Sequence, residues 1–243
     1  MVARAQKSKG TILVTGASRG LGFEFARQYA EDGWHVIATC RAPEKAAQLK
    51  KLMQGNDNIT LFQLDVTDAK SIARLAKGLK GAAIDVLLNN AGVVGKAFKK
   101  TGKEISLNKV DYQEFARVVD SNFYGPLRVT EALLKNVQRS KIKKIANISS
   151  RSGSIAGVWS DAVAYSVSKA SLNCAMRAFA RDLKPAKVTV INLCPGWTRT
   201  DMTSPKATHA APDSVQRLKK IIDKTALKDT GRFVDRDGKD IPW

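Results

Sequence analysis

The chain has 243 residues, and 44% of them are hydrophobic, as expected for a globular protein with a sizeable core. Its 41 lysines and arginines outnumber its 22 acidic residues, which gives a formal net charge of +19. Three cysteines, mostly far apart, and two histidines argue against a disulfide framework and a metal site, and no apolar run approaches the roughly 18 residues of a membrane helix.

The first ten residues, MVARAQKSKG, are basic and are followed at once by TILVTG. That apolar run is too short for the core of a signal peptide, and nothing after it resembles a cleavage site. We therefore expect a cytoplasmic protein in which residues 1–10 form a basic N-terminal extension and residues 11–243 a single domain, without a linker or a repeat.

Short runs rich in Val, Ile and Leu recur along the chain without polar alternation, which is typical of strands buried on both faces of a sheet. Six such runs are predicted to be strands. In chain order they are TILVTG at 11–16, HVIATC at 35–40, ITLFQLDV at 59–66, DVLLNNAG at 85–92, KIANIS at 144–149 and KVTVINLCPG at 187–196.

Helical patterns lie between these strands. In the first of them Leu21, Phe25 and Tyr29 recur at a spacing of four residues, and Gly33 follows as a C-cap. The alternation predicts an α/β fold, a doubly wound parallel sheet with helices on both faces and right-handed crossovers. The predicted helices are Leu21–Glu31, Glu44–Gln54, Asp68–Leu79, Asp111–Asn136 and Ala164–Leu183.

The last part of the chain follows a different pattern. Asp213–Leu227 is predicted to form one more helix. GRFVDRDGKDIPW, residues 231–243, contains a turn at DRDG between two short extended pieces. We expect this tail to supply either a last edge strand or a closing flap.

The basic residues are spread over several clusters, at 50–51, 96–103, 139–144 and 217–220. No single cluster dominates, and no aromatic residues are interleaved with them as stacking platforms for bases. We therefore expect a solvated basic surface, with neither nucleic acid nor a membrane as a partner.

The segment TGASRGLG, Thr15–Gly22, joins the first predicted strand to the first helix. Its glycines, Gly16, Gly20 and Gly22, let the backbone turn sharply and approach a diphosphate, to which the helix N-terminus offers free N–H groups. Their spacing, G-x-x-x-G-x-G, differs from the commonest dinucleotide fingerprint, G-x-G-x-x-G. Because ligands bind at the carboxyl ends of parallel strands, this loop is a candidate cofactor site.

Two further motifs fall at the same edge of the sheet. NNAG, Asn89–Gly92, ends the fourth strand with small residues against which a ligand can lie. Ser149 and Ser150 follow the fifth strand, and Tyr165 and Lys169 then stand about one helical turn apart on one face.

A Tyr hydroxyl beside a Lys ammonium can exchange a proton with a carbonyl group. For work near pH 7 the phenol pKa must fall by about three units, or about 4 kcal/mol. A Lys charge about 6 Å away supplies about 2.8 kcal/mol at an effective dielectric near 20. The positive ring of an oxidised nicotinamide would supply the remainder, and a serine hydroxyl would hold the substrate oxygen.

TGASRGLG, NNAG, YSVSK and PGWTRTD, in that order, resemble the motifs of the short-chain dehydrogenase/reductase family, over nearly the whole chain from about Thr11. The tail TGRFVDRDGKDIPW and the segment VIATCR further resemble the sniffer and C-factor carbonyl reductase branch of that family. The resemblance implies a Rossmann-type fold and a nicotinamide-dependent oxidoreductase.

The resemblance also implies roles for single residues. Tyr165 would be the general acid/base, and Lys169 would lower its pKa and bind the nicotinamide ribose. Ser150 would orient the carbonyl, and Asn122 would hold a water that links Lys169 to solvent. Asp65 and Val66 would meet the adenine, and the residues from 195 to 200 the nicotinamide. With the two arginines discussed below, the expected cofactor-binding residues are Gly16, Ser18, Arg19, Gly20, Leu21, Gly22, Arg41, Asp65, Val66, Asn90, Ala91, Gly92, Tyr165, Lys169, Pro195, Gly196, Thr198 and Thr200.

Two positions depart from the family pattern. The gap from Ser150 to Tyr165 is two residues longer than the common spacing, which Ser152 would match. We choose Ser150, because NISSRSG aligns with the family's strand-S-x-x-G pattern and an insertion in SIAGVWSDAV, residues 154–163, absorbs the difference. Thr198 stands where the family often has an apolar residue.

The end of the second strand bears on the choice of cofactor. An acidic residue there would bind the adenosine ribose and repel a 2′-phosphate. This strand ends IATCR, with no acid before Glu44, and Arg41 and Arg19 are both candidates to pair with a 2′-phosphate. We therefore predict NADP(H).

The predicted function is NADPH-dependent reduction of a small-molecule aldehyde, ketone or quinone to an alcohol. The alternatives are an NAD-dependent alcohol dehydrogenase, a cofactor-binding signalling protein with little turnover, and a nucleic-acid binder suggested by the charge of +19. The intact set of Ser150, Tyr165 and Lys169 disfavours the signalling protein. Helices Asp111–Asn136 and Ala164–Leu183 carry more small and apolar residues than one sheet face requires. Family members commonly pair through these helices, so we expect a homodimer or homotetramer.

Overall fold

A computed structural model describes residues 8–96, 110–157 and 162–243. Its strands form one parallel sheet in the order β3-β2-β1-β4-β5-β6-β7. Most of the proposed N-terminal extension lies outside the described residues. The strands are β1 (Thr11–Val14), β2 (His35–Cys40), β3 (Ile59–Gln63), β4 (Val86–Asn89), β5 (Lys144–Ile148), β6 (Thr189–Cys194) and β7 (Phe233–Asp235).

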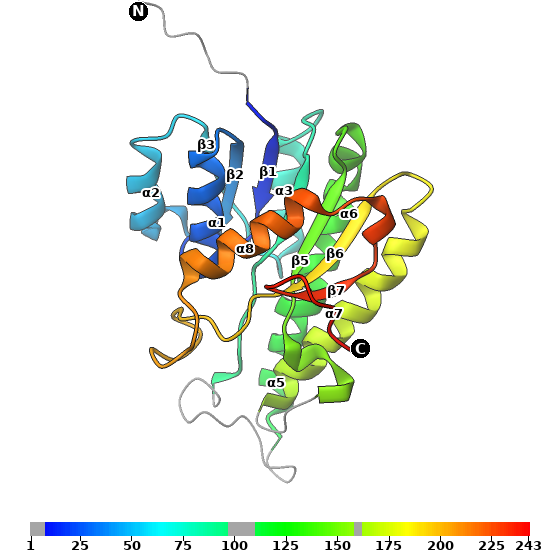
Figure 1. The fold of residues 1–243 in the computed structure, drawn as a ribbon. Helices are drawn as coiled ribbons and strands as arrows, with labels where there is room; N and C mark the ends of the chain where they lie inside the picture. Colours follow the sequence, from blue (N-terminus) through cyan, green and yellow to red (C-terminus); the bar gives the residue numbers. More distant parts are fainter. Residues whose placement is uncertain (1–7, 97–109, 158–161) are drawn as a thin grey trace, which may run out of the picture.

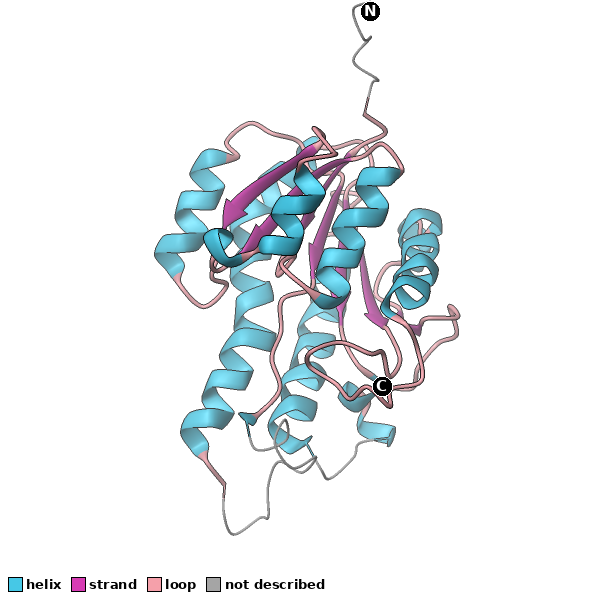
Figure 2. Cartoon of the chain, turned by 90° about the vertical axis from the view of Figure 1, so that its left-hand side faces the viewer, coloured by secondary structure: helices cyan, strands magenta, loops and turns pink. Residues whose placement is uncertain are grey.

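Helices cover both faces of the sheet (Figures 1 and 2), which confirms the predicted doubly wound α/β fold. One apolar core joins the sheet to α1, α2 and α8, and a second joins its other face to α3, α6 and α7. In the described ranges no helix is long and apolar enough to cross a membrane. The helices are α1 (Gly20–Glu31), α2 (Ala47–Met53), α3 (Ala69–Gly78), α5 (Tyr112–Val119), α6 (Gly125–Arg139), α7 (Val163–Asp182) and α8 (Ala211–Lys224).

All six predicted strands are confirmed, and most stop earlier than predicted because their last residues turn into the loops of the ligand edge. The tail forms the edge strand β7, with a turn at Gly238 (φ +81°) and an antiparallel bridge from Val234 to Asp240. Gly33 caps α1 as predicted, with φ +80° and its N–H donated to Ala30.

The predicted helix Asp111–Asn136 is interrupted by a π-helical turn, Asp120–Tyr124, between α5 and α6. Pro126 explains part of this break, because it has no N–H to donate to the carbonyl of Asn122, four residues earlier. The N–H of Gly125 instead bonds the carbonyl of Asp120, five residues back. The predicted helix Glu44–Gln54 likewise begins with a separate 3₁₀ turn, Pro43–Lys45, before α2.

Three buried asparagines fix the register of the central strands. Asn89, Asn147 and Asn192 lie side by side on β4, β5 and β6, and each is at most 2% exposed. The Nδ2 of Asn89 donates to Oδ1 of Asn147 at 2.9 Å, and the Nδ2 of Asn147 donates to Oδ1 of Asn192 at 3.0 Å. A shift in the register of one strand would break this chain of buried hydrogen bonds. The three strands are therefore fixed relative to one another along their axes, and so are the loops that follow them.

Candidate active site

The loops after β1 and β4 are packed too closely for side chains at their glycines. Gly16 has φ +70°, and a Cβ there would lie 3.0 Å from Cα of Ala91. A Cβ on Gly22 would lie 2.2 Å from the carbonyl oxygen of Gly16 and 2.5 Å from Nδ2 of Asn90. Asn90 joins the two loops, because its Nδ2 donates to the carbonyl of Thr15 at 2.8 Å. The two motifs therefore form one rigid unit.

The N-terminus of α1 opens at this unit. Its N-cap residue, Arg19, makes no side-chain hydrogen bond to the first turn, and that turn holds no acidic residue. Gly20 has φ +58°, and Ser18 and Leu21 are half-buried. The N–H groups of the first turn are thus free to bind an anion, so the loop fits the diphosphate of a dinucleotide.

The loop after β6 closes over the glycine loop. A Cβ on Gly20 would lie 3.5 Å from the side chain of Thr200, so the two loops pack directly together. Arg19 also reaches across, with Nε 3.5 Å from a carboxylate oxygen of Asp201. Pro195 and Gly196, which has φ +72°, begin the turn that carries this loop over the sheet.

The side chain of Thr198, a residue expected to flank the nicotinamide, points into the protein. The residue is 2% exposed, and its hydroxyl lies 2.9 Å from the hydroxyl of Ser214 and donates to the carbonyl of Pro195 at 2.9 Å. A hydroxyl with these partners stabilises the loop against α8. Any contact between Thr198 and a cofactor would therefore come from its backbone.

Lys169 lies at the centre of the site. Its side chain projects from α7 toward the end of β5, where Nζ donates to the carbonyl of Ile148 at 2.8 Å. Nζ is 3.6 Å from the position of a Cβ on Gly92 and 5.7 Å from the ring centre of Tyr165. The residue is 4% exposed, and burial lowers its pKa to about 8.

Ser150 and Tyr165 are brought together as predicted. The two side chains form a hydrogen bond, which favours the tyrosinate and so opposes the effect of burial on the pKa of Tyr165. Ser152 donates its backbone N–H to Oγ of Ser150 at 3.2 Å, so it helps to orient that hydroxyl. This contact supports Ser150 over Ser152 as the candidate catalytic serine.

The pKa of Tyr165 differs from the sequence-based expectation. Lys169 was expected to lower it, but in the protein alone burial dominates and raises it to about 12. Burial also lowers the pKa of Lys169, so the site disfavours the charged form of both side chains. At neutral pH Tyr165 is therefore a protonated phenol, which is the form that can donate a proton.

Asn122 sits in the π-helical turn and is fully buried. Its Oδ1 accepts from the N–H of Val93 at 2.8 Å, and its Nδ2 donates to the carbonyl of Val93 at 2.8 Å. Nδ2 also donates to Oγ of Ser168 at 3.0 Å, which ties the turn to α7. Both Nδ2 hydrogens are used by these contacts, so a water near Lys169 would bind either the backbone of Asn122 or the second lone pair of Oδ1.

The residues expected at the adenosine end lie after β2 and β3. Arg41 is exposed at the end of β2, and it forms no ion pair within the described ranges. Oδ1 of Asp65 accepts hydrogen bonds from the N–H and the hydroxyl of Thr67. Val66 packs against Gly125, where an added Cβ would lie 2.8 Å from the Val66 side chain. Arg41 is therefore free to meet a ribose phosphate.

Two residues near the site were not foreseen from the sequence. The hydroxyl of Ser168 donates to the carbonyl of Tyr165 at 2.7 Å and accepts from Asn122, so it joins two of the predicted residues. Cys194 is buried and accepts from the N–H of Arg151 at 3.1 Å. Burial raises the pKa of Cys194, which keeps it a neutral thiol. The sequence signal for each was its position, because Ser168 directly precedes Lys169 and Cys194 directly precedes Pro195.

We expect the buried Lys169 to make stability depend on pH. The unfolded chain holds this proton up to about pH 10.5, whereas the folded protein releases it near pH 8. Between these values the unfolded state binds more protons, so folding gains stability as the pH rises. The difference in unfolding free energy, wild type minus Lys169→Met, should increase by up to about 3 kcal/mol between pH 7 and pH 10.5. Urea unfolding at several pH values measures it, and parallel curves for the two proteins would contradict the assignment.

The comparisons with known proteins agree with this geometry. A model of the short chain dehydrogenase family matches residues 10–211, and the chain belongs to that family. It is 42% identical over 161 residues to C-signal of Myxococcus xanthus, a match that covers 66% of this chain and 93% of C-signal. The carbonyl reductase Sniffer of D. melanogaster superposes with a TM-score of 0.89 at 29% identity, covering 96% of this chain and 99% of that one. An NADPH-bound carbonyl reductase from chicken fatty liver gives a TM-score of 0.87 at 28% identity, covering 98% and 96%.

Proposed function

We propose that the protein uses NADPH to reduce a small-molecule carbonyl compound, an aldehyde, ketone or quinone, to an alcohol. The observation that carries this proposal is the contact of Ser150 with Tyr165, with the ammonium group of Lys169 5.7 Å from the ring of Tyr165. A proton donor, a second hydroxyl and a cation are thus gathered beside the glycine-rich unit. The likeness to carbonyl reductases adds support.

In the proposed reaction the bound nicotinamide supplies a hydride to the carbonyl carbon. Ser150 and Tyr165 both donate hydrogen bonds to the carbonyl oxygen, which fixes its position and polarises it. Tyr165 then delivers its proton to that oxygen as negative charge develops there. Lys169, held by the carbonyl of Ile148, stabilises the tyrosinate that results and binds the nicotinamide ribose.

Consumption of NADPH, followed at 340 nm, against a panel of aliphatic and aromatic aldehydes, ketones and quinones tests the proposal. We expect alcohol formation from at least one class, with one NADPH consumed per carbonyl reduced. Turnover of primary or secondary alcohols with NAD⁺, and none of any carbonyl with NADPH, would favour the alternative alcohol dehydrogenase. No turnover in either direction, together with tight cofactor binding, would favour the signalling alternative.

The signalling alternative has one observation in its favour, the 42% identity to C-signal. A protein that only binds the cofactor, however, has no need of a hydroxyl pair aimed at a carbonyl oxygen. The retained contact between Ser150 and Tyr165 therefore favours catalysis.

We propose NADPH over NADH, because β2 ends at Cys40 and is followed by Arg41, with no acidic residue there to repel a 2′-phosphate. Arg41→Asp should weaken NADPH binding by about 10- to 150-fold, since a charge-assisted hydrogen bond contributes about 1.5–3 kcal/mol, and should affect NADH less. Fluorescence titration with both cofactors measures this. Lys51→Asp, an equal charge change on the exposed side of α2, is the matched control. Equal binding of NADH and NADPH by the wild type would contradict the preference.

We also propose a homodimer that pairs through the α5–α6 segment and α7. Val163 and Val167 are 38% and 41% exposed at a spacing of one turn on α7. Tyr112, the first residue of α5, and Tyr124, the last of the π-helical turn, are also exposed. Apolar side chains in such positions favour association. Light scattering at micromolar concentration should give twice the monomer mass, and a monomer mass would rule the pairing out.

A further inference from the structure

The turns that precede the last four strands lie side by side at the amino edge of the sheet, opposite the candidate active site. The N–H of Lys144 bonds the carbonyl of Asp85 at 3.0 Å, which joins the turns before β4 and β5. The N–H of Thr189, at the start of β6, donates to the carbonyl of Lys143 in the turn before β5 at 2.9 Å. The N–H of Gly231, in the turn before β7, donates to the carbonyl of Val190 in β6 at 2.8 Å. The four turns therefore form one continuous surface.

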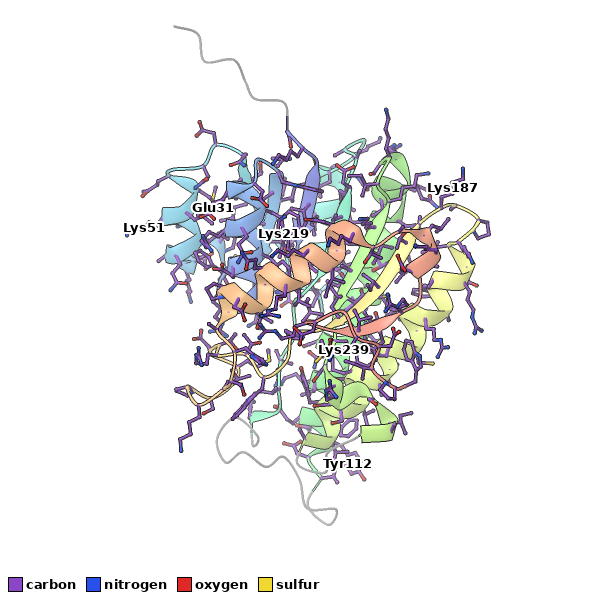
Figure 3. The ribbon with its side chains drawn as sticks, viewed as in Figure 1. Glu31, Lys51, Tyr112, Lys187, Lys219 and Lys239 are labelled. Atoms are coloured by element: carbon purple, nitrogen blue, oxygen red, sulfur yellow. The ribbon has the colours of Figure 1, made fainter. Side chains whose placement is uncertain are left out.

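Basic residues from separate parts of the chain gather there. Because these residues are scattered in sequence, a solvated surface was the expectation; the fold instead places them on adjacent turns. In Figure 3, Lys187 marks this part of the molecule, and Lys51 and Lys239 lie away from it. The amino-edge basic surface, as we name it, consists of Lys80, Arg139, Lys141, Lys143, Lys184, Lys187 and Lys228.

None of these seven residues forms an ion pair with an acidic residue in the described part of the chain. Three acids lie on these turns, and a fourth, Asp223, lies just before the last turn and pairs with Lys219. Asp85 is occupied by the N–H of Thr11 and the hydroxyl of Ser140, and Asp229 by the N–H of Ala226. Asp182 remains as an exposed acid. The surface thus carries a clear excess of unpaired positive charge.

Two of the lysines occupy strained backbone positions. Lys143 and Lys187 have φ +54° and +59°, the left-handed region in which glycine or asparagine normally stands. Both are held by hydrogen bonds, from the N–H of Lys143 to Ser140 Oγ and from the N–H of Lys187 to the carbonyl of Lys184. The chain keeps a cation at two positions where an uncharged residue would be less strained, which points to a use for the charge.

The composition of the turns limits what can bind them. The exposed large hydrophobic residues of the described chain lie elsewhere, so this surface has nothing to insert into a lipid bilayer. The turns, residues 79–85, 139–143, 182–188 and 225–232, contain no Phe, Trp or Tyr on which the bases of a single strand could stack. The remaining mode of binding is electrostatic attraction between the basic side chains of this surface and a dense row of phosphates.

We propose that the amino-edge basic surface binds the phosphate backbone of duplex nucleic acid, without reading its sequence. Four adjacent strands spaced by about 4.8 Å span about 14 Å. This matches the width of about 12 Å of a B-form major groove, so cations at the two ends of the surface reach phosphates on both sides of the groove. The partner sits opposite the cofactor site, so this binding is independent of the proposed function.

A fluorescein-labelled 20-base-pair DNA duplex of random sequence is the probe, and anisotropy at several KCl concentrations is the measurement. Saturating NADP⁺ is present throughout, so that the duplex cannot enter the nucleotide site. With about seven phosphate contacts, the slope of log K against log salt should be about −6. No binding by the wild type at 50 mM KCl would overturn the proposal.

The test variant combines Lys141→Gln and Lys184→Gln with Lys143→Gly and Lys187→Gly. It should bind at least about tenfold more weakly at 100 mM KCl, with a slope near −3, because four contacts are lost. The two glycines relieve backbone strain, so the thermal midpoint should not fall and weaker binding cannot be blamed on unfolding.

The matched control removes four exposed lysines elsewhere, through Lys51→Gln, Lys70→Gln, Lys220→Gln and Lys239→Gln. It has the same net charge as the test variant and should retain most of the affinity and the steep slope. An equal loss in both variants would show that only overall charge matters, which contradicts a defined surface. Tighter binding to phosphatidylserine vesicles than to the duplex would replace nucleic acid by a membrane surface.

Discussion

Tyr165→Phe should lower the rate of carbonyl reduction by about 10²- to 10⁴-fold and leave the affinity for NADPH nearly unchanged. The substitution removes only the hydroxyl that we propose as the proton donor, and a positioned general acid contributes a factor of this size. The pKa of about 12 keeps that hydroxyl protonated at neutral pH, so the wild type has a proton to donate there and the variant has none. Steady-state kinetics and a fluorescence titration of NADPH measure the two effects.

Tyr124→Phe is the matched control, because Tyr124 is 48% exposed and lies outside the site. It should leave turnover unchanged. Ser150→Ala should reduce turnover in the same direction as Tyr165→Phe, and Ser152→Ala should have a much smaller effect, since only Ser150 bonds Tyr165 through its side chain. Near-normal turnover by Tyr165→Phe would rule out the mechanism.

Gly22→Ala should weaken NADPH binding by about 100-fold or more. The added Cβ would lie 2.2 Å from the carbonyl oxygen of Gly16, a backbone atom that can move only if the whole loop moves. Displacement of the loop would remove N–H contacts to the diphosphate, each of which contributes about 1.5–3 kcal/mol as a charge-assisted hydrogen bond. Calorimetric titration of NADPH measures the loss.

Gly55→Ala provides the control for this change, because a Cβ at Gly55 meets nothing within 4 Å and its φ is not positive. It should bind NADPH as the wild type does. Gly22→Ala is also expected to lower the free energy of unfolding by about 1–3 kcal/mol through overpacking. Unchanged binding by Gly22→Ala would contradict the assignment of this loop to the cofactor.

The fold class and the place of the site were accessible from the sequence because both depend on local patterns. Buried strands of a parallel sheet read as continuous apolar runs, and the glycine motif and the NNAG segment follow such runs directly. The contact of Gly22 with Gly16 and Asn90 shows why these residues are small. The sequence placed Ser150 and Tyr165 at the same edge of the sheet, and their roles came from the resemblance to the family, but the hydrogen bond between them appears only in the structure, because the residues at 151–164 separate them in the chain.

Other properties depend on what surrounds a residue in space, which no local pattern records. The pKa of Tyr165 rises because burial outweighs nearby charge, and a pairwise estimate from the sequence had no burial term. The hydroxyl of Thr198 turns toward Ser214 because α8 packs there. The π-helical turn between α5 and α6 depends on Pro126, which has no N–H to donate to the carbonyl of Asn122 on the preceding turn.

The sequence by itself determined the doubly wound parallel sheet, its six main strands and the residues at its carboxyl edge, because hydrophobic period, glycine spacing and strand ends are local features of the chain. Only the tertiary structure decided which charges meet. Arg139, Lys141 and Lys143 come more than forty residues before Lys184 and Lys187, yet the parallel pairing of β5 with β6 sets their turns side by side. Parallel strands return to the same edge after every crossover, so residues far apart in the chain share one surface, and that surface is invisible until the strand order is known.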